Sequence, residues 1–216
     1  MTGGLPGFQL AAMTFFIGFI IILVSQKIMG IPVWKEWKNS AQTYIFVTAG
    51  IGVYTALLFL SFKLIHPFEA NTLNYTWPIL LALFISVLQR QSISTHQILG
   101  IILGFTGVAA IFWKGFDIPV FSIGHITALS AAILWALYSS YAKKFSYSVF
   151  FLVPVFLLSG ILCLVFHLMF EKTVVPTGFQ AALILILGIM RISYLMWDHG
   201  VRKGNAIILS SLAYFI

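Results

Sequence analysis

The stretch FQLAAMTFFIGFIIILVSQKI, residues Phe8–Ile28, carries no charged side chain before Lys27. As a helix rising about 1.5 Å per residue, it is long enough to cross a hydrocarbon core roughly 30 Å thick. Comparable apolar runs fill most of the remaining chain, and an eighth run begins near Gly204 and reaches Ile216. We therefore predict an all-α fold, a polytopic membrane helix bundle of about seven full helices and a partial eighth. The other full runs are Tyr44–Ile65, Phe68–Leu88, Gln97–Trp113, Ile123–Tyr141, Ser148–Phe170 and Phe179–Gly200.

Composition supports the same class of protein and excludes several others. Of the 216 residues, 61% are hydrophobic and 8% are charged, against roughly 25% charged in a soluble domain. One small core could not bury that much apolar surface, which excludes a soluble enzyme, a disordered tail and a secreted disulfide scaffold. Cys163 is the single cysteine, and the sequence has no HExxH or P-loop motif. We therefore expect no metal, no cofactor and no catalytic residue.

The positive charges assign the loops to the two sides of the membrane. In a soluble protein the net charge of +7 would suggest a nucleic-acid partner, but here the charges lie between apolar runs, so we expect no nucleic acid. One set of alternate loops carries eight Lys and Arg and the other carries three, which places the first set in the cytoplasm. The first set is Lys27, Lys35, Lys38, Arg90, Lys143, Lys144, Arg202 and Lys203, and the second is Lys63, Lys114 and Lys172.

A weak internal repeat relates the two parts of the chain. Gly50 and Ile51 match Gly188 and Ile189 at an offset of 138 residues, and whole runs recur at a similar spacing. The repeat unit is five helices, and because five is odd the two halves are inverted in the membrane. We therefore expect one membrane domain, residues 1–216, with an incomplete first half at 1–116 and an incomplete second half at 117–216. Inverted repeats of this kind are typical of secondary transporters.

Several segments resemble one known family. They are ANTLNYTWP (Ala70–Pro78), LGIILGFTGV (Leu99–Val108), ILWALYSSYAKKF (Ile133–Phe145) and YLMWDHGVRKGNAIILSSLAYF (Tyr194–Phe215). They are similar to EamA-type permeases of the drug/metabolite transporter superfamily, closest to its aromatic-amino-acid exporter branch. The resemblance implies a ten-helix permease of the cell (inner) membrane, of which this chain looks like helices two to nine, truncated at both ends. It also implies a small-molecule substrate, such as an aromatic amino acid or a related metabolite, with the lipid bilayer as the other partner.

The run Phe68–Leu88 carries a polar and aromatic stripe beside a proline. Asn74, Tyr75 and Pro78 recur at helical spacing with Trp77 next to them, and Pro78 deprives the Asn74 carbonyl of its helical partner. Such a carbonyl must be satisfied by a neighbour, water or a ligand. We expect a kink at Pro78 and a cavity wall formed by Asn74, Tyr75 and Trp77. The alternative is a structural patch of interhelical hydrogen bonds.

Two aromatic pairs are further candidates for binding substrate. Trp135 and Tyr138, and likewise Tyr194 and Trp197, are three residues apart, so each pair shares a helix face. Flat rings with one donor each suit aromatic or cationic substrates. The alternative is an aromatic belt at the membrane interface, which suits Tyr138 and Trp197 better than the other two.

Arg191 lies about halfway along the run Phe179–Gly200, where an arginine costs roughly 2.5–3.5 kcal/mol on insertion scales. Two roles stay open for it: binding a substrate carboxylate, or a structural contact with helix-end carbonyls or Asp198. Gly100 and Gly104 form a GxxxG pair, which we interpret as a helix-packing face.

Together these features favour a secondary transporter, an exporter of small metabolites such as amino acids, with alternating access around a midplane cavity. The alternative is a seven-helix receptor or another integral membrane protein without transport activity. A retinal protein needs a mid-membrane lysine in its last full helix, and that run offers Arg191 instead.

The charge count predicts the topology. Cysteines placed at Ser40 or Ser146 are expected to react with an impermeant thiol reagent from the cytoplasmic side, and cysteines at Ser122 or Thr177 from the outer side. The background for this labelling lacks Cys163. Labelling of all four positions from one side would contradict the assignment.

Overall fold

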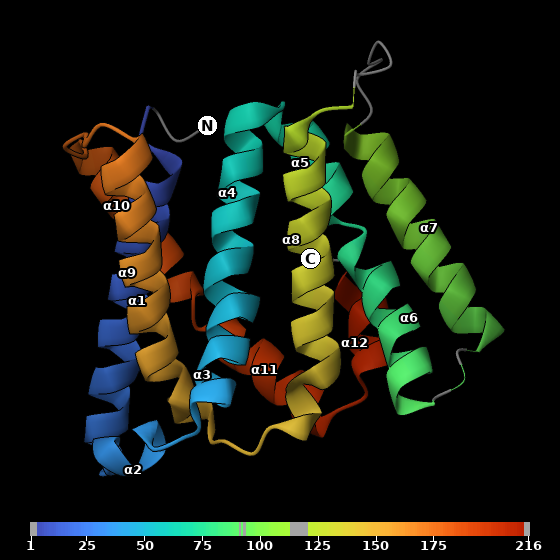
Figure 1. Cartoon of the computed structure of the whole chain (residues 1–216), viewed down its shortest axis with the longest axis horizontal. Coiled ribbons are helices and arrows are strands. Elements are labelled where there is room, and N and C mark those ends of the chain that lie inside the picture. Colours follow the sequence, from blue (N-terminus) through green and yellow to red (C-terminus); the bar gives the residue numbers. More distant parts are fainter. Residues whose placement is uncertain (1–3, 91, 93, 113–120, 214–216) are drawn as a thin grey trace. The chain divides into compact units, whose positions relative to one another are not determined.

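The computed structural model describes residues 4–90, 92, 94–112 and 121–213 (Figure 1). Within them, six helical stretches are long and apolar enough to cross a membrane. The prediction of an all-α polytopic membrane helix bundle is therefore confirmed. Position 113 and positions 214–216, where two of the predicted runs end, lie outside the described residues. The six stretches are Gly7–Ile28, Ala41–Leu64, Pro67–Leu88, Ile123–Lys144, Val149–Phe170 and Gly178–Lys203.

The helices follow one another with short connections. In chain order they are α1 (Gly7–Ile28), α2 (Val33–Trp37), α3 (Ala41–Thr48), η1 (Ala49–Val53), α4 (Tyr54–Leu64), α5 (Pro67–Asn74), α6 (Trp77–Gln89), α7 (Thr95–Phe112), α8 (Ile123–Tyr141), η2 (Ala142–Lys144), η3 (Val149–Phe151), α9 (Leu152–Phe170), α10 (Gly178–Met190), α11 (Ser193–Lys203) and α12 (Ala206–Leu212).

The chain divides into two compact units. Unit 1 comprises Met1–Ala56 and Phe145–His199, and unit 2 comprises Leu57–Lys144 and Gly200–Ile216. In unit 1, α9 packs against α1, α3 and η1, and α1 packs against α10. In unit 2, α8 packs against α5 and α6, and α12 packs against α6 and α7. Each unit draws on both predicted halves, whose boundary at 116/117 lies outside the described residues, so the division into halves stays a prediction.

Side chains close to the helix starts satisfy N–H groups that have no partner inside the helix. Ser122 and His125 form a capping box at the start of α8, and Thr177 and Gln180 form another at the start of α10. The Asn205 side chain accepts from two N–H groups of α12, at 3.0 and 3.2 Å. Such caps fix where each helix begins.

Two membrane stretches depart from α-helical geometry at matching positions of the predicted repeat. η1 is a π-helix, and the helix is broken between α10 and α11, where the N–H groups of Arg191 and Ile192 donate to the carbonyls of Gly188 and Ile189, only three residues back. Gly50, inside η1, is the residue that the sequence repeat pairs with Gly188. Non-α turns of this kind often mark functional positions in a helix.

A buried carboxylate ties the start of α1 to the end of α9. The two oxygens of Glu171 accept from the backbone N–H groups of Phe8 (3.2 Å) and Gln9 (3.1 Å), and Oε2 lies 3.0 Å from His167 Nδ1. The Gln9 side chain also pairs with the Val174 backbone in both directions. The Glu171 side chain is 4% exposed, so a residue of another helix caps α1 and places a negative charge at its positive end.

This contact predicts a measurable loss of stability. In Glu171→Gln the acceptor for two backbone N–H groups loses its charge, and hydrogen bonds to a charged group contribute roughly 1.5–3 kcal/mol. We expect the variant to unfold at a lower temperature than the wild type in detergent. Lys172→Gln is the matched control, because the exposed neighbouring residue also loses one charge. Equal midpoints for the two variants would show that the tie contributes nothing.

Candidate substrate-binding site

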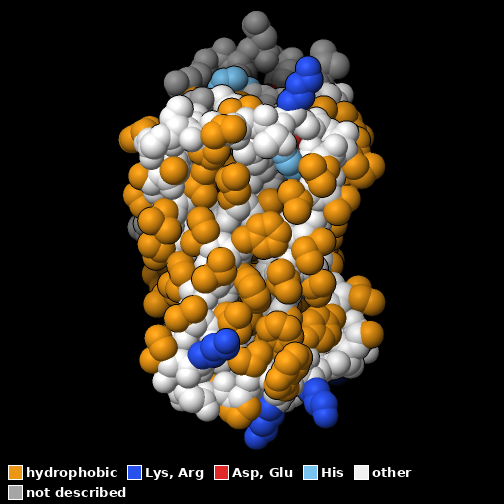
Figure 2. Space-filling model, turned by 90° about the vertical axis from the view of Figure 1, so that its left-hand side faces the viewer, with side chains coloured by type: hydrophobic (Ala, Val, Ile, Leu, Met, Phe, Trp, Pro, Cys, Tyr) orange, Lys and Arg blue, Asp and Glu red, His pale blue; other side chains and the backbone are white. Residues whose placement is uncertain are grey.

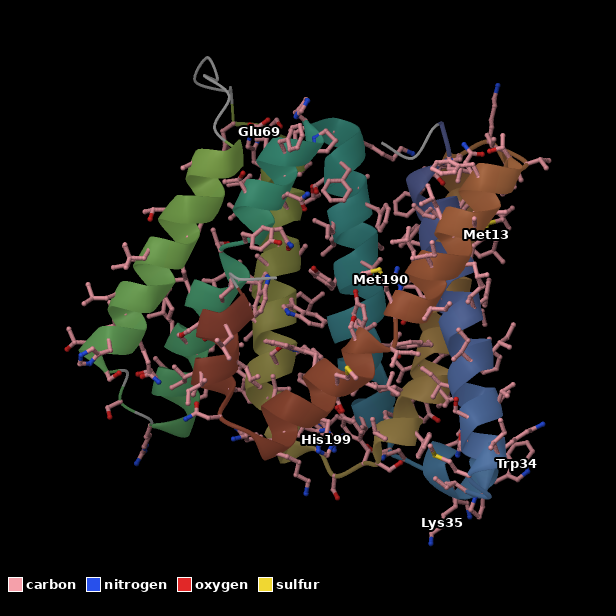
Figure 3. The ribbon with its side chains drawn as sticks, turned by 180° about the vertical axis from the view of Figure 1, so that it is seen from behind. Met13, Trp34, Lys35, Glu69, Met190 and His199 are labelled. Atoms are coloured by element: carbon pink, nitrogen blue, oxygen red, sulfur yellow. The ribbon has the colours of Figure 1, made fainter. Side chains whose placement is uncertain are left out.

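Arg191 lies at the break between α10 and α11, about midway along unit 1. Figure 3 shows the neighbouring Met190 between Met13, towards one end of the unit, and Trp34 and Lys35 at the other end. A guanidinium at this depth cannot be left in hydrocarbon and must find partners within the protein.

Two side chains of unit 1 supply those partners. Nε and Nη2 of Arg191 donate to the hydroxyl of Thr14, at 3.3 and 3.0 Å, and Nη1 donates to the hydroxyl of Tyr194 at 3.0 Å. Thr14 comes from α1 and Tyr194 from α11, so the contacts join helices that lie far apart in sequence. The contact between Arg191 and Asp198, one of the structural roles considered from the sequence, does not form. Asp198 is fully buried and accepts from the Tyr147 hydroxyl at 2.7 Å.

Aromatic rings surround the guanidinium. Its central carbon lies 4.0 Å from the ring centroid of Phe15 and 5.3 Å from that of Tyr194, distances typical of cation–π contacts. Phe156 of α9 packs edge-on against both rings, with centroids 5.6 and 6.0 Å away. A Cβ added to Gly18 would lie 3.0 Å from the Cβ of Arg191. The glycine therefore allows α1 to approach the break closely.

The cluster leaves part of the guanidinium available. Among the described residues, Thr14 and Tyr194 take three of the five N–H groups of Arg191. One N–H remains on each terminal nitrogen. Two such groups match the two oxygens of a carboxylate in a bidentate contact.

A second aromatic cluster belongs to unit 2. Trp77 of α6 and Trp135 of α8 meet edge to face with centroids 6.3 Å apart, and Tyr138 lies 5.5 Å from Trp135. Trp135 is 8% exposed and Tyr138 is 1% exposed. Asn74 ends α5 and is buried, and α6 begins at Trp77, so the helix is interrupted just before Pro78.

The structure thus distributes the predicted residues over two clusters. Arg191 and Tyr194 meet in unit 1, and Trp77, Trp135 and Tyr138 meet in unit 2. Tyr75 lies at the end of α5, and Trp197 is half-buried on α11. A Cβ added to Gly100 would meet no described atom within 4 Å. The roles assigned to these residues, including packing by Gly100 and Gly104, stay predictions.

Sequence reasoning missed four residues of the Arg191 cluster, namely Thr14, Phe15, Gly18 and Phe156. One signal for Thr14 was available, since it is the one hydroxyl-bearing residue between Phe8 and Val24. Nothing in the sequence pairs it with Arg191, because the two are 177 positions apart.

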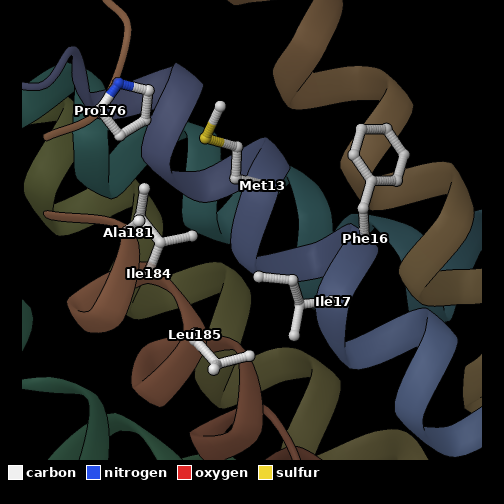
Figure 4. A pocket seen from close by; sticks show the side chains of 7 residues that line it. All are labelled: Met13, Phe16, Ile17, Pro176, Ala181, Ile184 and Leu185. Atoms are coloured by element: carbon white, nitrogen blue, oxygen red, sulfur yellow. The ribbon is translucent and has the colours of Figure 1, made fainter. Parts of the chain in front are cut away.

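A groove of about 440 Å³ lies between α1 and α10, with Pro176 at its rim. Its lining is entirely apolar (Figure 4). A zwitterionic or charged molecule finds no partner there.

Figure 2 shows the face of unit 1 over α1, α9 and α10, where hydrophobic side chains dominate and Lys and Arg lie towards the ends. This is the surface expected towards lipid chains, so the groove is no candidate for a polar substrate. The lining residues are Met13, Phe16, Ile17, Pro176, Ala181, Ile184 and Leu185.

Apolar helices of membrane length, with an arginine enclosed at mid-depth, define a multi-pass integral membrane protein. Comparison with known proteins supplies its class. The EamA-like transporter family matches residues 1–113 of the chain. A solved crystal structure superposes with a TM-score of 0.90 at 26% identity, covering 99% of this chain and 76% of the other.

Three relatives in sequence are named as transporters. The aromatic amino acid exporter YddG of Ancylobacter novellus is 27% identical over 226 residues, covering 99% of this chain and 76% of the relative. The aromatic amino acid exporter YddG of Salmonella typhimurium is 25% identical over 164 residues, covering 68% and 54%. The uncharacterized transporter YvbV of Bacillus subtilis is 31% identical over 103 residues, covering 43% and 34%. The chain belongs to the EamA-like transporter family, and it is a membrane transporter rather than an enzyme.

Proposed function

We propose that the protein exports amino acids or closely related metabolites across the cell (inner) membrane, by alternating access around a midplane cavity. The preferred substrate carries a carboxylate and an aromatic ring. The observation that carries the proposal is Arg191, held at mid-depth with two N–H groups that no described residue accepts. The names of the exporters to which the chain is similar support the same substrate class.

Arg191 supplies the charge for the carboxylate. Side chains that serve structure alone rarely include an arginine at membrane depth, because its desolvation is costly. A carboxylate that entered the site would neutralise the charge and accept the two remaining N–H groups. Charge-assisted bidentate contacts of this kind are both strong and selective.

An aromatic ring on the substrate would gain from flat apolar surfaces, and Trp77, Trp135 and Tyr138 are residues that the sequence predicts for such a contact. Trp135 contacts both of the other rings, edge to face with Trp77 and tilted against Tyr138. Edge-to-face and offset-stacked contacts with an aromatic substrate each contribute about 0.5–1.5 kcal/mol. An aliphatic side chain would gain less from the same surfaces.

The carboxylate assignment predicts a selective loss of transport in Arg191→Leu. In proteoliposomes, kcat/KM for phenylalanine is expected to fall about 10- to 100-fold more than kcat/KM for phenylalaninamide, because only the acid loses a charged hydrogen-bond partner. Arg191→Lys keeps the charge without the two-pronged geometry, so an intermediate loss is expected. An equal fall in kcat/KM for phenylalanine and phenylalaninamide in Arg191→Leu would show that Arg191 has a structural role only.

The aromatic assignment predicts a different selectivity for Trp135→Ala. Removal of the indole is expected to lower kcat/KM for phenylalanine about 2- to 10-fold relative to alanine, since alanine has no ring to stack. Trp34→Ala is the control, because Trp34 is 80% exposed and lies at one end of unit 1. An equal change in kcat/KM for phenylalanine and alanine would show that Trp135 does not bind the aromatic ring.

A further inference from the structure

We propose that Thr14 is the positioning residue that turns the free edge of Arg191 towards a substrate carboxylate. The inference rests on the proposed function and adds to it a specificity-determining residue on α1. It starts from the hydrogen bonds of one buried hydroxyl, which is 2% exposed.

The hydroxyl proton of Thr14 is already used in a hydrogen bond within α1. Its hydroxyl donates to the carbonyl of Ala11 at 2.9 Å, and a hydroxyl has one proton and two acceptor lone pairs. Both contacts with Arg191 are therefore acceptances by Thr14, from Nε and from Nη2. The bond to Ala11 fixes the direction of those lone pairs, because it belongs to the same helix turn.

These contacts fix the position of the guanidinium and leave two of its N–H groups without an acceptor among the described residues. Thr14 occupies the edge formed by Nε and Nη2, Tyr194 holds Nη1, and the plane lies over the Phe15 ring with its central carbon 4.0 Å from the centroid. Three contacts from two helices leave the planar group little freedom to rotate. Ordering the side chain before the substrate arrives removes an entropic cost from binding. What remains is one N–H group on Nη1 and one on Nη2 that no described residue accepts.

A planar anion with two equivalent oxygens fits such a pair, and a carboxylate has this shape. An amide offers one acceptor and no charge, so it cannot replace a carboxylate there. The preference for acid over amide should therefore depend on the hydroxyl of Thr14, although Thr14 has no free proton for the substrate.

The test compares two substitutions of one residue. Thr14→Val keeps the shape and removes the acceptor, and Thr14→Ser keeps the acceptor and removes a methyl group. The readout is the ratio of kcat/KM for phenylalanine to kcat/KM for phenylalaninamide in proteoliposomes. We expect Thr14→Val to lower this ratio about five- to tenfold and Thr14→Ser to leave it within about twofold of the wild type.

Thr127→Val is the matched control. The Thr127 hydroxyl donates to the Gly124 carbonyl at 2.9 Å, the same bond to a carbonyl three residues earlier, and the residue is 9% exposed. Within the described part of the chain no arginine contacts Thr127, so the acid-to-amide ratio should not change. Each variant is first checked by its melting midpoint and elution profile. If Thr14→Val does not fold, Tyr194→Phe removes the other acceptor while keeping the ring, and it should lower the same ratio.

The outcomes separate the inference from the function on which it rests. A wild type that transports neither compound, or both equally, contradicts the proposed function. A wild type that prefers the acid, loses the preference in Arg191→Leu and keeps it in folded Thr14→Val contradicts the role of Thr14. Loss of the preference in Thr14→Val with recovery in Thr14→Ser supports it.

Discussion

A charged guanidinium at the depth of lipid chains has to be satisfied by protein, and the arrangement of unit 1 follows from this constraint. Arg191 can meet Thr14 and Tyr194 because the helix is broken after Met190, where two N–H groups donate three residues back. The break lies against α1 because Gly18 has no side chain to hold it away. The insertion cost of the arginine is thus offset by hydrogen bonds and ring contacts from α1 and α11 rather than by one ion pair.

The same requirement governs the helix ends, where backbone groups lose their helical partners. In unit 1 the carboxylate of Glu171 caps α1 from the end of α9 and lies beside His167. In unit 2 the Glu69 carboxylate lies 2.6 Å from His125 Nε2, which joins the starts of α5 and α8. In each unit a carboxylate that lies beside a histidine therefore connects two helices at their ends.

The spans could be predicted from the sequence because hydrophobic length alone determines them. Arg191 could be predicted to contact other protein groups, because a charged side chain left in hydrocarbon has a large free-energy cost. Its partners could not, because Thr14 is the one polar side chain between Gln9 and Ser25, and a single residue does not fix the rotation of α1 about its axis. The π-helix η1 could not be predicted either. Gly50 and Gly52 permit a wider turn, but the turn also depends on packing against Ser159 of α9, a contact that the sequence does not reveal.

The interruptions at η1 and after α10 fall at matching positions of the sequence repeat, yet the residues there differ. An offset of 138 places Arg191 opposite Val53, the last residue of η1. The predicted halves therefore share a backbone irregularity at this position, where Arg191 is charged and Val53 is apolar. An inverted repeat with identical chemistry in both halves would offer a substrate two equivalent orientations. With Arg191 in one predicted half and Val53 in the other, we expect the proposed carboxylate-bearing substrate to have one favourable orientation, because Arg191 offers its anionic group a charged partner and Val53 does not.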